Sequence, residues 1–369
     1  MSDALDSGTP AAGPAGGWAV VVPSIGRPSL QALLDSLSAL DPGTPRPTEV
    51  VVVDDRRDPR PPLAPTWESV VGQAAVPLRV VQSAARGPAA SRNVGWRATT
   101  AAWAAFLDDD VLVPPGWSAA LAADLAACAA TDGASTGRIE VPLPIDRRPT
   151  DWERNTAALA DAVWATADMA YRRAALVAVG GFDERFPRAY REDADVAVRV
   201  TRAGWDIRAG QRWVTHPVRP ADDRVSIRVQ AGNADDALLL ALYGRRWRTV
   251  ARTGPGRGGW HAATVGAAGL AVGAALARRP RVAAGSALAW AGLTADFARR
   301  RIVPGPAPAD PAFAAEVRRM VLTSMAIPPV AAWHRARGAW RWRRGAVPWG
   351  PPDVESPDAV APHDVPAPG

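Results

Sequence analysis

The sequence predicts an α/β fold in which helices flank a mostly parallel sheet and an α-helical extension follows at the C-terminus. Short Val-rich runs alternate with stretches whose apolar residues recur at helical spacing. Strands that alternate with helices in this way form parallel sheets with right-handed crossovers. One apolar run leads directly into Asp108, Asp109 and Asp110. Because unpaired buried carboxylates are costly, we expect these acids at the carboxyl end of a strand, where open sheets bind ligands.

Four strands are expected in the N-terminal half, with helices between them. The strands are 18–23, 49–55, 78–81 and the Phe106-Leu107 segment, and the helices follow Pro28 and cover 89–103. Three of these strands end in polar or acidic residues: Pro23-Ser24, Asp54-Asp55 and Asp108-Asp109-Asp110. Since parallel strands bring their carboxyl ends to one edge, we expect these residues to line one ligand cleft.

The second half is expected to contain a strand over 163–171, a short helix over 172–179, a helix that starts at about Glu192 and is ended by Gly204, and a strand over 208–216. The last strand ends in His216. Consecutive helical residues point about 100° apart. We therefore expect Glu192 and Asp193 to have different roles.

The composition indicates a globular chain, with 48% hydrophobic and 22% charged residues among 369. Its 43 basic residues are all arginine, and the net charge is +6. Without interleaved aromatic and basic residues or a binding motif, this charge does not indicate a nucleic-acid partner. A single cysteine, Cys128, and an N-terminus without a signal-peptide pattern favour a reducing, cytoplasmic location.

In order and spacing, these motifs resemble glycosyltransferase family 2, whose members are inverting enzymes with the GT-A fold. The resemblance covers about 18–248 and includes the Asp-X-Asp element 108–110. It also includes Ala-Ser-Arg-Asn-Val-Gly over 90–95, Gly-Gly-Phe-Asp-Glu over 180–184, and Glu192-Asp193. It implies an enzyme that moves a sugar from a nucleoside-diphosphate sugar to a hydroxyl acceptor, with Mg²⁺ or Mn²⁺ as cofactor. Polysaccharides, glycolipids and secondary metabolites at the inner membrane face are the implied acceptors, and the cell envelope is the implied setting.

The resemblance also implies roles for particular residues. Asp108, Asp110 and His216 would hold the metal, because a divalent ion neutralises the leaving diphosphate. The donor would be bound by Pro23, Ser24, Asp54, Asp55, Arg92, Asp108 and Asp109. Asp193 is the expected catalytic base, and Glu192 is the second candidate. One departure from the family lies at 56–59, where Arg-Arg-Asp-Pro replaces a Gly-Ser type turn.

Two other functions remain open at this point. A polyprenyl-phosphate sugar synthase shares the fold and would use C-terminal helices to reach its lipid. A catalytically silent binding module would keep the fold and a partner surface, and would bind nucleotide without metal.

The C-terminal part changes character, and we expect a helical, membrane-associated region over 249–345. Two apolar runs, 261–277 and 282–298, would each be about 25 Å long as helices, against about 30 Å of hydrocarbon in a bilayer. A pair of spanning helices, a hairpin on the membrane surface and an ordinary helical pair are all compatible with these lengths. Flanking arginines favour anionic headgroups at the inner face of the cell membrane. The ends, 1–17 and 346–369, are rich in Pro, Gly and Ala and are expected to be disordered.

Overall fold

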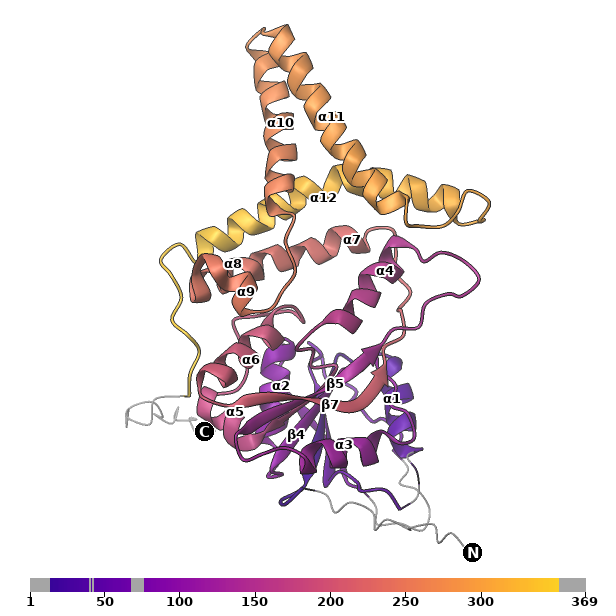
Figure 1. Ribbon diagram of the computed structural model, residues 1–369, viewed down its shortest axis with the longest axis vertical. Coiled ribbons are helices and arrows are strands. Elements are labelled where there is room, and N and C mark those ends of the chain that lie inside the picture. The colour runs from indigo at the N-terminus through magenta and orange to yellow at the C-terminus, as the bar shows by residue number, and fades with distance from the viewer. Residues whose placement is uncertain (1–13, 40, 42, 68–75, 352–369) are drawn as a thin grey trace, which may run out of the picture.

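The computed structural model describes residues 14–39, 41, 43–67 and 76–351. Most of the two ends that we expected to be disordered lies outside these residues. Within them, the chain forms one sheet with helices on both faces, and a helical extension stands on one side of it (Figure 1). The predicted fold class is confirmed.

The sheet has seven strands in the order β3-β2-β1-β4-β6-β5-β7. Strand β1 is parallel to both β2 and β4, β2 is parallel to β3, and β5 is parallel to β7. Only β6 runs antiparallel to its neighbours, β4 and β5. The strands are β1 Trp18–Ser24, β2 Glu49–Asp54, β3 Leu78–Gln82, β4 Trp103–Leu107, β5 Asp132–Glu140, β6 Asp168–Arg172 and β7 Asp206–Thr215.

Alternate residues of the central strands pack into two separate apolar layers. In β1, Val20 and Val22 pack with buried residues of α1 (Ser29–Ser38) and α3 (Trp117–Ala126). Val21 faces the other layer, which includes residues of α2 (Pro88–Arg97), α5 (Arg173–Val179) and α6 (Glu192–Arg202). Because both faces are covered, the central strands are nearly continuous apolar runs, as is typical of parallel sheets.

Two of the expected elements differ in extent, and one strand was not expected. The helix expected over 89–103 ends at Arg97, and Trp103 already belongs to β4. Between them the Thr99 hydroxyl accepts a hydrogen bond from the Ala101 amide, which closes a turn. The strand expected over 163–171 starts later and is β6, while β5 was not expected at all.

The C-terminal extension is helical, as expected. In Figure 1, α10 and α11 form a hairpin that projects away from the sheet, and α12 crosses the base of this hairpin. The extension also includes shorter helices close to the catalytic half. Its helices are α7 Val225–Arg228, η2 Val229–Gly232, α8 Asn233–Tyr243, η3 Gly244–Arg246, α9 Trp247–Val250, α10 Gly258–Leu276, α11 Pro280–Ile302 and α12 Phe313–Arg341.

Both ends of the extension are hydrogen-bonded to α6 and to the segment between α5 and α6. Near its start, the Tyr243 hydroxyl donates to Asp195 Oδ1 on α6 at 2.6 Å. After α12 the chain returns, and the Trp349 indole N–H donates to the Gly180 carbonyl at 3.0 Å. The Arg185 guanidinium also donates to the Val347 carbonyl at 2.8 Å.

Candidate active site at the carboxyl edge of the sheet

A cavity of about 360 Å³ opens where β1, β2 and β4 end. This volume is within the usual range for small-molecule sites. The structure therefore brings to one edge most of the residues that the sequence singled out. Those that line the cavity are Pro23, Ser24, Asp55, Arg92, Asp108, Asp109, Asp110 and His216.

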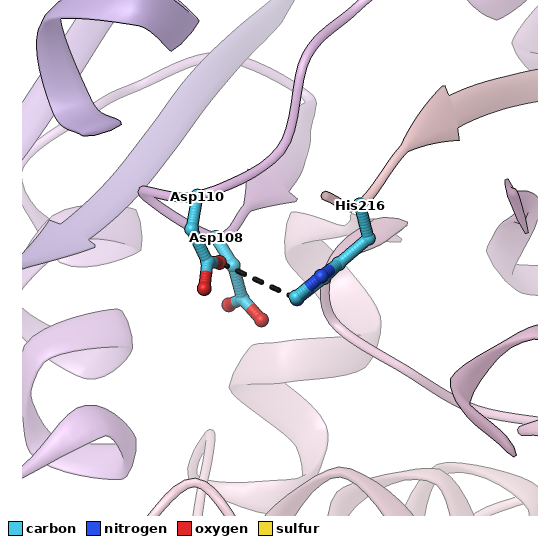
Figure 2. Close-up of side chains that lie close together, drawn as sticks. All are labelled: Asp108, Asp110 and His216. Carbon is cyan, nitrogen blue, oxygen red and sulfur yellow. Dashed lines mark ion pairs between the residues drawn. The ribbon is translucent and has the colours of Figure 1, made fainter. Parts of the chain in front are cut away.

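Three side chains in the cavity form a cluster that suits a divalent cation. Asp108, Asp110 and His216 each offer one ligand atom, and these atoms lie within 4.8 Å of one another. Figure 2 shows the two carboxylates and the imidazole converging, with Asp110 Oδ1 at 3.5 Å from His216 Nε2. Two carboxylates and one imidazole are donors that Mn²⁺ and Mg²⁺ accept.

Local backbone pairing brings these distant residues together. Leu112, just after the aspartates, forms an isolated antiparallel bridge with Thr215 at the end of β7. The next residue, His216, donates its backbone N–H to the Glu140 carbonyl at the end of β5. The position of the histidine therefore depends on β5 and β7, and not on the aspartate loop alone.

Burial and the nearby Asp108 carboxylate both raise the pKa of Asp110, and His216 and Arg219 oppose this effect. The Arg219 Nε lies 2.8 Å from Asp110 Oδ2. Arg219 also lines the cavity, and the sequence analysis did not identify it. A cation in the cluster would stabilise the ionised form of Asp110, as Arg219 does now.

Arg92 links the aspartate loop to α6. This side chain is 2% exposed, and its Nη2 donates to Asp108 Oδ1 while its Nη1 donates to Glu192 Oε1, both at 2.8 Å. Asp193 Oδ1 lies 3.8 Å from the same Nη1. Burial lowers the pKa of Arg92, but the carboxylates of Asp193, Asp108 and Glu192 outweigh it, so the net shift is upward. Arg92 therefore stays charged and holds three acids around it.

The glycine one turn further along α2 explains how Arg92 reaches this position. A Cβ on Gly95 would overlap the Val21 side chain and would lie 3.0 Å from that of Val53. The helix can therefore pack directly on β1 and β2 only because residue 95 has no side chain. The motif 90–95 thus combines a buried cation with the close helix packing that positions it.

Glu192 and Asp193 differ in exposure and in partners. Glu192 is 1% exposed, and its pKa is raised well above the usual range by burial and by Asp193. The Asp193 side chain is 24% exposed and accepts hydrogen bonds from the Thr166 backbone N–H at 3.1 Å and hydroxyl at 2.9 Å. Burial also raises the pKa of Asp193, against the lowering effect of Arg92. Glu192 is thus enclosed as a partner of Arg92, whereas Asp193 keeps contact with solvent.

The backbone turns sharply just before this pair. Arg191 has a φ of 81°, in the left-handed region that non-glycine residues rarely adopt. Its side chain is held by Asp236, with Nε at 2.9 Å from Oδ1. Such strained residues concentrate at functional sites, where the surrounding contacts hold them.

Hydrogen bonds hold several of the expected donor-binding residues in place. Ser24 Oγ donates to Asp109 Oδ2 at 2.6 Å, and Arg27 Nη1 donates to Asp109 Oδ1 at 2.8 Å. Asp55 accepts from Ser83 Oγ at 2.5 Å and from the Gly87 backbone N–H at 3.0 Å. These contacts hold the loop after β1 to the loop after β4, and the loop after β2 to the loop after β3.

Asp54 is not among the residues that line the cavity. Both of its oxygens accept hydrogen bonds from Arg56, at 2.9 and 2.7 Å, and these bonds lower the pKa of Asp54. Arg56 also donates to the Pro59 and Pro61 carbonyls. The departure from the family at 56–59 thus supplies a direct partner for Asp54.

Comparison with known proteins identifies the N-terminal part of the chain. Residues 19–174 match the model of glycosyl transferase family 2. No curated protein matches the chain in sequence.

Several solved structures are similar. A mannosyltransferase from Pyrobaculum calidifontis, in complex with GDP-Man and Mn²⁺, is 18% identical with a TM-score of 0.45, covering 88% of this chain and 87% of its own. S. aureus TarS 1–349 with UDP-GlcNAc is 15% identical with a TM-score of 0.39, covering 88% and 91%. Glucosyl-3-phosphoglycerate synthase from Mycobacterium tuberculosis, in complex with Mn²⁺, UDP and glucosyl-3-phosphoglycerate, is 18% identical with a TM-score of 0.41, covering 65% and 82%.

With TM-scores below 0.5, these likenesses add no argument to the family match. The matched residues contain β1 to β6 and the three aspartates, and the mostly parallel sheet with helices on both faces is the arrangement expected of the GT-A fold. The chain carries a glycosyl transferase family 2 domain and is a glycosyltransferase.

Proposed function

We propose that this protein transfers a hexosyl group from a nucleoside-diphosphate sugar to a hydroxyl acceptor, with inversion. One observation carries the proposal: the cluster of Asp108, Asp110 and His216 is connected through Arg92 to Asp193, the more exposed acid of the pair on α6. A charge-binding centre for the leaving group and a base for the acceptor thus belong to one network.

The donor would bind across the edge of the sheet. Pro23, Ser24 and Asp55 line the cavity on the side of β1 and β2 and would face the nucleoside. Asp54 does not line the cavity and would act indirectly, by holding Arg56. Asp108, Asp110 and His216 would hold Mg²⁺ or Mn²⁺, which would neutralise the diphosphate. Arg92 and Asp109 would keep the aspartate loop in place.

Asp193 would take the proton of the acceptor hydroxyl. As that oxygen forms its bond to the anomeric carbon, the bond from this carbon to the diphosphate oxygen breaks, and the nucleoside diphosphate leaves. A positioned base of this kind typically contributes about 10²–10⁴-fold. A single displacement inverts the anomeric centre, and Glu192 would support it by holding Arg92.

The first experiment is a calorimetric titration of UDP-, GDP- and dTDP-linked sugars into the full chain, with Mn²⁺ and then with EDTA. We expect one nucleotide class to bind, and only in the presence of Mn²⁺. Binding of equal strength in EDTA would favour the catalytically silent module instead. Turnover with a polyprenyl phosphate, and with no hydroxyl acceptor, would identify a polyprenyl-phosphate sugar synthase.

We also propose that 18–248, which takes in the first helices of the extension from α7 to η3, is the catalytic unit, and that 249–345 contacts a membrane surface at the inner face of the cell membrane. Among the described residues, one helix, α10, is long and apolar enough to span a bilayer, with a mean hydropathy of 1.2 and 17% of the span buried. Its length of 19 residues corresponds to about 28 Å. Leu276 at the end of α10 and Leu288 on α11 are 81% and 74% exposed, which favours an apolar environment for the hairpin.

A further inference from the structure

A second cavity, of about 320 Å³, lies between the catalytic half and the extension. Its walls come from α4 (Asp151–Ala157), α7, η2 and the facing parts of α11 and α12. In Figure 1, α4 and α7 lie between the sheet and α12, which crosses the base of the α10–α11 hairpin. The proposed donor site leaves this cavity without a role.

The cavity has both a basic and an apolar character. Val225, Val229, Phe297, Met320 and Ile327 contribute apolar surface. Five arginines also line it, against three acids, so the lining has an excess of positive charge: Arg154, Arg257, Arg300, Arg301 and Arg319, with Asp151, Asp222 and Glu316.

The arginines differ in how far they are already occupied. The buried Arg301 donates to Asp151 Oδ2 at 2.8 Å and to the Thr323 and Ser324 hydroxyls, and therefore belongs to the framework. The Arg300 side chain donates from Nε to Asp296 and makes no other hydrogen bond within the described residues. The Arg257 side chain makes none there either, and its guanidinium lies 5.6 Å from the centre of the Phe297 ring. Donors of Arg257 and Arg300 thus remain available beside an apolar wall.

The two cavities share a helix. Trp152 and Asn155, three residues apart on α4, line both of them. The Trp152 indole N–H donates at 2.9 Å to the carbonyl of Arg219, whose guanidinium pairs with Asp110. A molecule in the second cavity would therefore lie one helix away from the proposed metal cluster.

We infer that this second cavity binds an anionic amphiphile, a phosphate ester of a hydrocarbon chain. Arg257 and Arg300 contact the phosphate, and the chain packs on Phe297, Met320 and Ile327. The acceptor class follows when this binding is combined with the proposed function, on which it rests. The acceptor is an anionic lipid that carries the accepting hydroxyl. The phosphate binds at the base of the hairpin, and the hydroxyl reaches past α4 to the donor cavity.

The test is calorimetry on the full chain with farnesyl phosphate below its micelle concentration. We expect one site in the wild type and at least about tenfold weaker binding in the double variant Arg257→Gln/Arg300→Gln, because charge-assisted hydrogen bonds are lost. The matched control, Arg279→Gln/Arg281→Gln, removes the same charge from exposed residues at the turn of the hairpin. It should bind farnesyl phosphate as the wild type does.

Two further ligands separate the contribution of the hydrocarbon chain to binding from that of the phosphate. Farnesol and inorganic phosphate should each bind at least about tenfold more weakly than farnesyl phosphate, since each lacks half of the recognised chemistry. Equal weakening by both double variants would overturn the inference, because it would indicate general attraction to anionic lipid. Equal binding of farnesol, or no binding of farnesyl phosphate, would overturn it as well. The affinity of the same variants for the nucleotide-sugar donor should be unchanged. Donor titration therefore tests the proposed function separately from the lipid site.

Discussion

Asp193 and Glu192 are neighbours on α6, but the Asp193 side chain is 24% exposed, while Glu192 is enclosed with Arg92. Asp193→Asn should keep the shape and the Thr166 contact and remove the base. We expect turnover to fall by about 10²–10⁴-fold with donor affinity unchanged, measured by initial rates and by titration of the donor. Unimpaired turnover would exclude Asp193 as the base.

The pKa of Asp193 gives a prediction about pH. Burial raises it, Asp108 raises it further, and Arg92 and the hydrogen bonds from Thr166 lower it, with a net upward shift. A base must be ionised to accept a proton, so activity should be lost as the pH falls through this raised pKa. In a profile of kcat/KM against pH, the acid limb should lie above the ordinary aspartate value of about 3.9. A rate that stays constant down to about pH 4 would contradict this assignment.

Asp110 is predicted to be a direct metal ligand. Asp110→Asn removes one carboxylate from the cluster with Asp108 and His216. We expect Mn²⁺ binding, followed by electron paramagnetic resonance of the free ion, to weaken by at least about tenfold, and metal-dependent donor binding to be lost. The matched control is Asp58→Asn, because the Asp58 side chain is 68% exposed and outside the cluster. Unchanged Mn²⁺ affinity in Asp110→Asn would exclude this role.

At the scale of elements, α2 is joined to the turn that precedes α6 through one buried amide. Asn93 accepts from the Phe182 backbone N–H at 2.8 Å and from the Trp96 indole, and it donates to the Phe182 carbonyl at 2.8 Å. Its second acceptor is Glu184 Oε1, at 2.9 Å. Since Asn93 is fully buried, Asn93→Ala would leave several of these groups unpaired.

We expect Asn93→Ala to lower the free energy of unfolding by about 3 kcal/mol, from the usual cost of buried unpaired groups. Denaturant unfolding measures this change. The comparison is Gln31→Ala, whose hydrogen bonds with Thr66 and Asp35 lie at the surface and should contribute less than about 1 kcal/mol. Equal effects of the two substitutions would show that Asn93 does not join these elements.

The position of the acidic residues at the carboxyl edge of the sheet could be predicted from the sequence. Burying an unpaired carboxylate is costly, so an acid next to a Val-rich strand has few other possible positions. Strand β5 could not be predicted from the sequence, because its residues neither alternate between polar and apolar nor favour β structure. Gly133 packs against Trp205, and Gly137 leaves room for the buried Asp168 carboxylate, which pairs with Arg212 on β7. The contacts that stabilise β5 therefore come from segments that lie far from it in the sequence.

The same limit applies within the site. Arg219 and Thr166 lie in no recognisable motif, and their contacts with Asp110 and Asp193 exist only because β7 and α6 are in place. The position of Arg219, three residues after His216, was the one local signal available. By contrast, Arg92 and the aspartates could be selected because their motifs are short and continuous.

At the scale of the whole molecule, the hairpin offers a prediction about membranes. Leu276→Asp/Leu288→Asp places charges on its exposed apolar surface. We expect binding to vesicles that contain phosphatidylglycerol to fall by at least about tenfold in a sedimentation assay, because charge is expensive in a bilayer. The control, Ile145→Asp/Val177→Asp, alters exposed apolar residues of the catalytic half and should bind normally. Equal vesicle binding by both variants would exclude the hairpin as the contact.

The two ends of the extension are bonded to the same layer of the catalytic half, through Tyr243 with Asp195 and through Trp349 with Gly180. A segment attached at one end could swing about that point, but a segment attached at both resists rotation about either. The separation between the hairpin and the three-residue cluster is therefore set by the fold. A membrane-bound acceptor would have to span this fixed distance to reach the cluster. The enzyme would therefore select acceptors by the length of the spacer between their lipid and their sugar.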